Sequence, residues 1–231
     1  MLVTEEFVFL HIPKTAGSFV QTVLAEHLET VDLGTVLHER DPAARIWTHA
    51  SHSALPDPWR QLPAAWVVRN PWDWYVSWFS YQVQRAPWRK RPMDDSWEVA
   101  FLREETTFKE VVTAFCTEGL DQERVLGTHG AHMDLYSAIV RAIVGPDPDR
   151  DGVTALRFER LPKQLLRFLR THVEVTPAML RSIRRAPRKK TSRHGPYQDY
   201  YDDELAAVVG ETASWICERF GYRFEPPAQR A

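Results

Sequence analysis

The segment that most constrains the fold lies near the start of the chain, where an apolar run meets a proline, a lysine and a glycine. Residues 7–10 read Phe-Val-Phe-Leu, which is typical of a strand buried on both faces within a parallel sheet. From Gly17 onward, apolar residues recur at the spacing of one helix face as far as Leu28. The segment therefore predicts a strand that leads into a helix through a short turn.

This turn has the residues of an anion-binding site. Free backbone N–H groups and the positive end of the helix dipole favour an anion at a helix N-terminus. Lys14 adds a positive charge, Gly17 permits close approach of the backbone, and Thr15 and Ser18 carry hydroxyls. The turn is no Walker A loop, because Lys14 precedes the single glycine instead of following two. It predicts a phosphate-binding turn, with an ordinary strand-to-helix turn and a solvated lysine as the alternative.

Length and composition favour one globular α/β domain. The 231 residues are expected to form a single domain over 1–231, with a helical or loop insertion around 85–150. A formal net charge of −2 argues against a nucleic-acid binder. Cys116 and Cys217 are too far apart in the sequence to suggest a zinc ribbon, and a cytoplasmic protein is expected. No signal peptide or apolar run of about 18 residues is evident, so no membrane span is expected.

A second strand-to-helix junction follows the apolar run 64–68. Asn70 suits the N-cap of a helix, Pro71 its first position and Asp73 its first turn. The predicted helix extends to about Gln84 and places Ser77 on the same face as Asp73. Arg69, at the end of the strand, and Ser77 could therefore hold one phosphate from two sides.

The rest of the chain alternates between strand and helix patterns. Strands are predicted at 45–48 and 153–158, and helices at 107–116, 135–144, 161–169 and 199–220. A basic run, Arg181 to Arg193, precedes the last helix, which is expected to end at Gly221. The alternation predicts a three-layer α/β fold with a central, mainly parallel sheet.

Tryptophans are concentrated in one part of the sequence. Seven of the nine lie between Trp59 and Trp97. Packing in the core and along a cleft wall is the favoured interpretation, and an aromatic platform for an acceptor molecule is the alternative.

Three separated segments together resemble the PAPS-dependent sulfotransferases of the carbohydrate type, similar to heparan sulfate 2-O-sulfotransferase. PAPS is 3′-phosphoadenosine 5′-phosphosulfate. The segment FVFLHIPKTAGS looks like the family's 5′-phosphosulfate loop, and VVRNPWDWYVSWFSY looks like its 3′-phosphate motif. The third segment begins KTSRHGPYQDYYDDEL and ends FGYRF, and LRFERL is a supporting match.

The resemblance implies a P-loop-kinase-like fold and a set of cofactor-binding residues. It implies that the 5′-phosphosulfate is cradled by Lys14, Thr15, Ala16, Gly17, Ser18 and Phe19. It assigns the 3′-phosphate to Arg69 and Ser77. The nucleotide would be covered by Lys190, Thr191, Ser192 and Arg193. The chain departs from the family pattern at Phe19, where a hydroxyl residue is common, and at Trp74, where arginine is usual.

The implied reaction is in-line transfer of a sulfuryl group from PAPS to a hydroxyl, leaving PAP (3′-phosphoadenosine 5′-phosphate). By analogy with phosphoryl transfer, the protein mainly positions the reactants and stabilises charge, with Lys14 near the departing phosphate. Histidine is the first candidate for the base, and His49 is assigned to this role with His52 in reserve. No metal is expected, because the His-x-x-His pairs lack further ligands at an accepted spacing.

The acceptor and the assembly are left open by the sequence. A carbohydrate or a small natural product is the expected acceptor, a lipid is the alternative, and the oligomeric state is unknown. Two rival functions remain: an ATP-dependent kinase of P-loop ancestry, and a non-catalytic protein that keeps a PAPS site. The absence of a Walker A loop disfavours the kinase.

Overall fold

The computed structural model describes residues 1–32, 51–84, 106–117, 133–185 and 194–226. The chain divides into two compact units. Unit 1 comprises Met1–Arg69 and Val140–Thr191, and unit 2 comprises Asn70–Ile139 and Ser192–Ala231. The single domain over 1–231, with an insertion around 85–150, stays a prediction.

Unit 1 contains a five-stranded sheet of order β3-β1-β2-β4-β5. Its strands are β1 (Leu2–Val3), β2 (Val8–Leu10), β3 (Val31–Asp32), β4 (Ala64–Val68) and β5 (Val153–Arg157). The pairings β2–β4 and β4–β5 are parallel, whereas β1 pairs with β2 and β3 in antiparallel fashion. The sheet is therefore mixed, and the parallel arrangement expected from the sequence holds for its three adjacent strands β2, β4 and β5.

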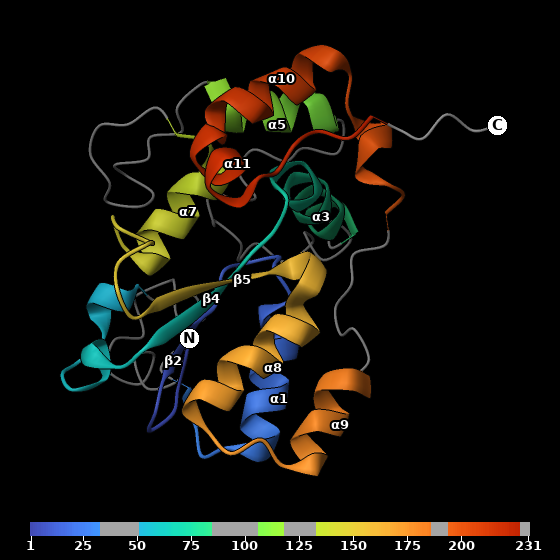
Figure 1. Cartoon of the computed structure of the whole chain (residues 1–231). Coiled ribbons are helices and arrows are strands. Elements are labelled where there is room, and N and C mark those ends of the chain that lie inside the picture. Colours follow the sequence, from blue (N-terminus) through green and yellow to red (C-terminus); the bar gives the residue numbers. More distant parts are fainter. Residues whose placement is uncertain (33–50, 85–105, 118–132, 186–193, 227–231) are drawn as a thin grey trace, which may run out of the picture. The chain divides into compact units, whose positions relative to one another are not determined.

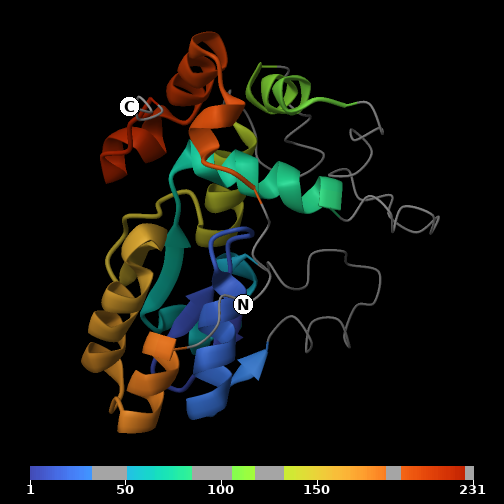
Figure 2. The ribbon, with the colours of Figure 1, turned by 90° about the vertical axis from the view of Figure 1, so that its right-hand side faces the viewer.

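One face of this sheet is covered by three helices of unit 1 (Figures 1 and 2). They are α1 (Gly17–His27), α8 (Leu161–His172) and α9 (Pro177–Arg185). Their apolar stripes, including Val20, Leu165 and Ile183, pack with Phe9 and Val67 in one core cluster. All five residues of β4 are buried, as expected for a central parallel strand. The three-layer arrangement beyond this face stays a prediction.

The carboxyl ends of the parallel strands lie at one edge of the sheet, because Leu10 pairs with Trp66 and Val68 with Arg157. The turn that leads to α1 follows β2, Arg69 follows β4, and the short helix η4 (Phe158–Arg160) follows β5. Edges of this kind are where ligands bind in open α/β sheets.

Unit 2 is helical in the part that the structure describes. Its elements are α3 (Pro71–Gln84), α5 (Phe108–Thr117), the start of α7 (Leu135–Val144), η5 (Tyr197–Tyr200), α10 (Asp203–Thr212) and α11 (Ser214–Phe220). The second half of α7, from Val140 onward, belongs to unit 1. Predicted helices 71–84, 107–116 and 135–144 match α3, α5 and α7.

Most of the described tryptophans pack in the interior. Trp66, Trp72, Trp74 and Trp78 are at most 4% exposed. The Trp74 ring stacks on Tyr136 with centroids 4.6 Å apart, and Nε1 of Trp72 donates to the carbonyl of Ala206 at 2.9 Å. The packing interpretation is confirmed for these four residues.

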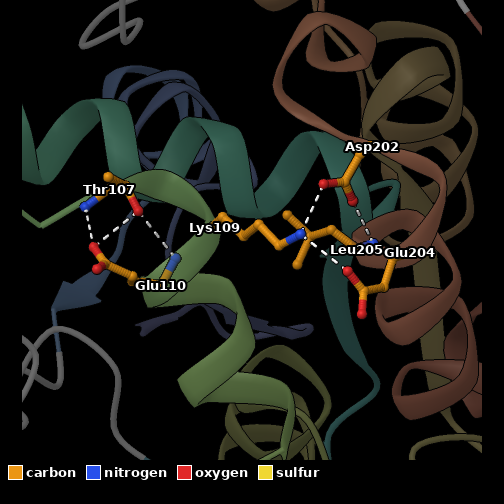
Figure 3. A network of polar contacts seen from close by, with 6 residues as sticks. All are labelled: Thr107, Lys109, Glu110, Asp202, Glu204 and Leu205. Atoms are coloured by element: carbon orange, nitrogen blue, oxygen red, sulfur yellow. Dashed lines mark hydrogen bonds and ion pairs between the residues drawn. The ribbon is translucent and has the colours of Figure 1, made fainter.

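Helix starts in unit 2 are fixed by local side chains. Asn70 accepts hydrogen bonds from the N–H groups of Trp72 and Asp73, as its position predicted. Figure 3 shows a reciprocal pair at the start of α5: Oγ1 of Thr107 accepts from the N–H of Glu110, whose carboxylate accepts from the N–H of Thr107.

The same close-up shows how an ammonium group joins α5 to the start of α10. Asp202 caps α10 by accepting from the N–H of Leu205 at 2.8 Å, and Lys109 donates to Asp202 and Glu204 at 2.8 and 3.0 Å (Figure 3). These charged groups are solvent-exposed, so the contacts orient the helix ends and add little stability.

One helix prediction was wrong, and one helix was not predicted. The helix expected over 199–220 is instead η5, then α10 capped by Asp202, then α11 after a break at Ala213. Helix α9 was missed, because only Met179 and Ile183 of its nine residues are buried and the pattern is dominated by arginine. The stop at Gly221 is confirmed, with a φ of 63°.

Candidate functional site

The turn after β2 contains two left-handed residues that are not glycine. Lys14 has a φ of 63°, and Ala16, the N-cap of α1, has a φ of 64° and a ψ of 22°. Each such residue costs about 1–2 kcal/mol of backbone strain relative to a right-handed conformation. Strain of this kind persists only where the surroundings enforce it, and turns with left-handed residues form N–H concavities that bind anions.

Hydrogen bonds inside the turn enforce part of this conformation. Thr15 is fully buried, and its Oγ1 donates to the carbonyl of Ile12 at 2.9 Å. The N–H groups of Phe19 and Val20 donate to the carbonyl of Ala16, and the Phe19 ring packs against the core. Thr15 and Phe19 therefore shape the turn from within, whereas Ser18 is half-buried at the first turn of α1.

Gly17 is required by its contact with a histidine. His11 is 6% exposed, and a Cβ built on Gly17 would lie 2.0 Å from Cδ2 and 2.3 Å from Nε2 of its ring. No side chain fits at position 17 while the imidazole stays in place. His11 therefore supports the start of α1 from beneath, a role that the sequence prediction did not include.

Arg69 connects the ends of all three parallel strands. Its Nη1 donates to the carbonyl of Lys14 at 2.9 Å, and its guanidinium carbon lies 4.4 Å from the centre of the Phe158 ring. The side chain is 7% exposed. The positive charge predicted from the second motif is thus held directly beside the turn predicted from the first.

Several predicted residues are not brought to this place by the structure. Ser77 lies in α3 of unit 2 and is 3% exposed, whereas Arg69 closes the first segment of unit 1, so their pairing stays a prediction. His49 and the four residues Lys190, Thr191, Ser192 and Arg193 lie outside the described residues.

His52 lies at the opposite edge of the sheet from Lys14. It begins the short helix η1 (His52–Ala54), and the charges that act on it are those of Arg150 and Arg60. Arg150 precedes β5, and Arg60, in η2 (Trp59–Gln61), precedes β4, so both mark the amino ends of the strands. Burial, then Arg150 and then Arg60 lower the pKa of His52. This placement does not support His52 as a base acting beside Lys14.

Two residues of the site escaped the sequence prediction. His11 interrupts an apolar run three positions before Lys14, and Phe158 stands in the LRFERL segment directly after a strand. A polar residue inside a buried run and an aromatic at a strand end are the signals that could have identified them. Neither signal identifies the contacts, because His11 meets Gly17, and Phe158 meets Arg69, only in the folded chain.

The described residues offer neither a metal-binding cluster nor a helix that could span a membrane. They contain no group of three or more His, Cys, Asp or Glu side chains placed to hold a metal ion. No helix of the described part combines the length and apolar character needed to cross a bilayer.

Comparisons with known proteins reveal a structural likeness. No protein-family model and no curated protein matches the sequence. The structure is similar to the crystal structure of the mouse sulfotransferase SULT7A1 complexed with PAP, with a TM-score of 0.54 and 14% identity over 90% of this chain and 84% of that one. At this identity the likeness shows that the chain shares the mixed α/β fold of this sulfotransferase.

Proposed function

We propose that the protein is a PAPS-dependent sulfotransferase that moves a sulfuryl group to a hydroxyl of an acceptor. The observation that carries the proposal is the 2.9 Å hydrogen bond from Arg69 to the carbonyl of Lys14, which joins two cationic, anion-seeking elements at one edge of the sheet. The fold shared with a sulfotransferase that was crystallised with PAP supports the same assignment.

The residues at this edge fit a nucleotide with phosphate groups at both ends. The N-terminus of α1 and the Lys14 turn offer backbone N–H groups and positive charge for the 5′ end. Arg69 offers a planar guanidinium, which suits the oxygens of the 3′-phosphate. Ser77 and the segment 190–193 are proposed to complete the site, as the family resemblance implies.

The chemistry required of the chain is mainly positioning and charge stabilisation. Bound PAPS supplies an activated sulfuryl group on an acidic phosphate leaving group. The Lys14 ammonium places positive charge where that phosphate gains negative charge, and the N–H groups at the start of α1 add to this stabilisation. His49 is the proposed base, accepting the hydroxyl proton of the acceptor on an imidazole nitrogen. No step requires a metal ion.

The finer assignments follow the family resemblance. We propose a carbohydrate or a small natural product as the acceptor. We also propose a cytoplasmic location, which accords with the free, buried thiols of Cys116 and Cys217.

Ligand-induced stabilisation tests the proposal before an acceptor is known. PAP is expected to raise the melting temperature, because a ligand at 100 times its Kd adds about 2.7 kcal/mol to the free energy of unfolding. ATP with Mg²⁺ is the comparison ligand. A larger shift with ATP and Mg²⁺ than with PAP would overturn the proposal in favour of a kinase.

Mass spectrometry then separates an enzyme from a non-catalytic PAPS-site protein. Acceptors incubated with the protein and PAPS should gain about 80 Da, the mass of SO₃, and the gain should disappear with the Lys14→Ala variant. PAP binding without any mass gain across a broad panel of hydroxyl compounds would favour the non-catalytic protein.

A further inference from the structure

We infer that Phe158 is a positioning residue that couples the two phosphate sites through Arg69. The inference rests on the proposed function, because it concerns the binding of PAP. Phe158 holds the Arg69 guanidinium in the one place from which it can both fix the Lys14 turn and face a 3′-phosphate. Binding at the 5′ end should therefore depend on a ring that lies across the site, after β5.

The carboxyl ends of three neighbouring strands, β2, β4 and β5, each contribute one group to this arrangement. The turn after β2 presents the carbonyl of Lys14, Arg69 after β4 donates to it at 2.9 Å, and Phe158 after β5 lies under the guanidinium at 4.4 Å. The strands that carry these residues are paired in parallel, so the residues are neighbours because of the sheet register.

The ring contact restricts where the guanidinium can lie, because its central carbon is 4.4 Å from the centre of the Phe158 ring. Arg69 is 7% exposed, so little water competes with the ring for its charge. Cation–π contacts are stronger when they are desolvated, and a flat ring restricts a planar guanidinium to stacked orientations. In that orientation Nη1 reaches the Lys14 carbonyl.

The carbonyl contact in turn bears on the strained turn. Lys14 has a φ of 63°, and a hydrogen bond to its carbonyl from a nearly buried cation opposes rotation of the adjoining peptide. Loss of the ring would free Arg69 to leave this carbonyl, and the turn would then have a lower barrier to relaxing into an ordinary conformation. The 5′ site would lose its shape even though Phe158 is not assigned to touch it.

Three mononucleotides distinguish coupling from a local effect. The ligands are PAP, adenosine 5′-phosphate and adenosine 3′-phosphate, each titrated calorimetrically into wild-type protein and the Phe158→Leu variant. Coupling predicts that Phe158→Leu weakens the binding of adenosine 5′-phosphate by about fivefold or more, a factor in the lower part of the range for cation–π contacts. The affinity of Phe158→Leu for adenosine 3′-phosphate should fall by a similar factor. Phe158→Tyr, which keeps the ring, should have the wild-type affinity for both ligands.

A matched control removes general destabilisation from the comparison. Phe168 is a core aromatic of the same unit that stacks edge-on with Phe7 at 5.1 Å and belongs to α8. Phe168→Leu should lower the melting temperature without changing any of the three affinities. If Phe158→Leu fails to fold, Arg69→Lys takes its place, because it keeps the charge, loses the fork and should give the same loss for adenosine 5′-phosphate.

The outcomes separate this inference from the proposed function. No PAP binding by the wild-type protein contradicts the proposed function itself. PAP binding with an unchanged affinity of the Phe158→Leu variant for adenosine 5′-phosphate overturns the coupling and leaves the proposed function intact. Equal losses in the Phe158→Leu and Phe168→Leu variants would reduce Phe158 to a packing residue and also overturn it.

Discussion

The imidazole of His11 occupies the space that any side chain on Gly17 would need, with ring atoms 2.0–2.7 Å from an added Cβ. We therefore expect Gly17→Ala to displace the ring or the start of α1 and to destabilise the protein by about 3 kcal/mol, the upper range for overpacking. PAP binding should weaken in the same variant, because the displaced turn carries Lys14. Urea unfolding and calorimetric titration measure the two effects.

A compensating change makes this prediction specific. His11→Ala combined with Gly17→Ala should be more stable than Gly17→Ala alone, because removal of the ring makes room for the methyl group. Gly195→Ala is a control, since its Cβ would meet only Oδ2 of Asp199 at 3.6 Å, an ordinary contact. An additive double variant would contradict the proposed contact between position 17 and the histidine.

Replacement of Lys14 should separate ligand binding from stability. Lys14→Ala removes a charged donor from the proposed 5′ site. The variant should therefore bind PAP at least about tenfold more weakly, the low end of the range for hydrogen bonds to charged groups. Lys163→Ala, on the exposed face of α8, should leave PAP affinity unchanged.

Replacing Lys14 by glycine tests the backbone strain at this residue. Lys14→Gly should be about 1 kcal/mol more stable than Lys14→Ala, because glycine adopts a φ of 63° without a Cβ clash. Equal stability of the two variants would show that the turn in solution is not left-handed at this residue.

Local sequence patterns were sufficient to predict most of the helices and strands and to locate both phosphate-binding motifs. The helix over 71–84 was predictable because Asn70, Pro71 and Asp73 each satisfy a rule of helix starts, and their cap is observed. The strands 8–10 and 64–68 were predictable because they are apolar runs bounded by turn residues. The strand 153–157 contains Thr154 and Arg157, and it was predictable from its β-forming residues after the turn signal at 145–148. The two-residue strands β1 and β3 are too short to show any period.

The contacts that shape the site could not be predicted from the sequence. Arg69 and Lys14 are 55 positions apart, and the contact of Arg69 with the Phe158 ring depends on the register between β4 and β5. The motif around Arg69 predicts a role in ligand binding, and nothing in the local sequence indicates that Arg69 also supports the Lys14 turn. The placement of His52 at the far edge likewise depends on chain direction through the sheet, which spacing alone does not give.

His52 should make the protein less stable in mild acid. Burial, Arg150 and Arg60 lower its pKa below the usual 6.5, so the unfolded state binds the proton more tightly. By linkage, His52 does not affect the free energy of unfolding above its unfolded pKa of about 6.5. As the pH drops below that value, the free energy of unfolding falls, and the fall ends below the lowered pKa of the folded state. His52→Gln should flatten the decline in unfolding free energy between about pH 6.5 and 5, measured by urea unfolding. An unchanged slope would contradict the lowered pKa.

The contribution of Asp134 to stability should have the opposite pH dependence to that of Asp202, the exposed aspartate that caps α10. Asp134 is fully buried, and its Oδ1 accepts hydrogen bonds from the hydroxyl of Tyr75 and the N–H groups of Tyr136 and Ser137 at 2.8–3.2 Å. Burial nevertheless raises the pKa of its carboxyl above 3.8. The folded state therefore binds the proton more tightly, and the contribution of Asp134 to stability is lost as the pH rises through the raised pKa.

Two asparagine substitutions test this difference in sign. Asp134→Asn keeps an oxygen acceptor without a buried charge, so its stability relative to wild type should improve as the pH rises from about 4 to 7. Asp202→Asn should show the reverse at lower pH, because hydrogen bonds from Lys109 and the N–H of Leu205 lower the pKa of Asp202 from its usual 3.8. The contribution of Asp202 is fully present above the unfolded pKa and is lost as the pH falls through the lowered pKa, so the advantage of wild type over Asp202→Asn should shrink below about pH 4. Urea unfolding measured from about pH 2.5 to 7 covers the range in which each carboxyl titrates. No gain in the relative stability of Asp134→Asn between about pH 4 and 7 would contradict the raised pKa of Asp134.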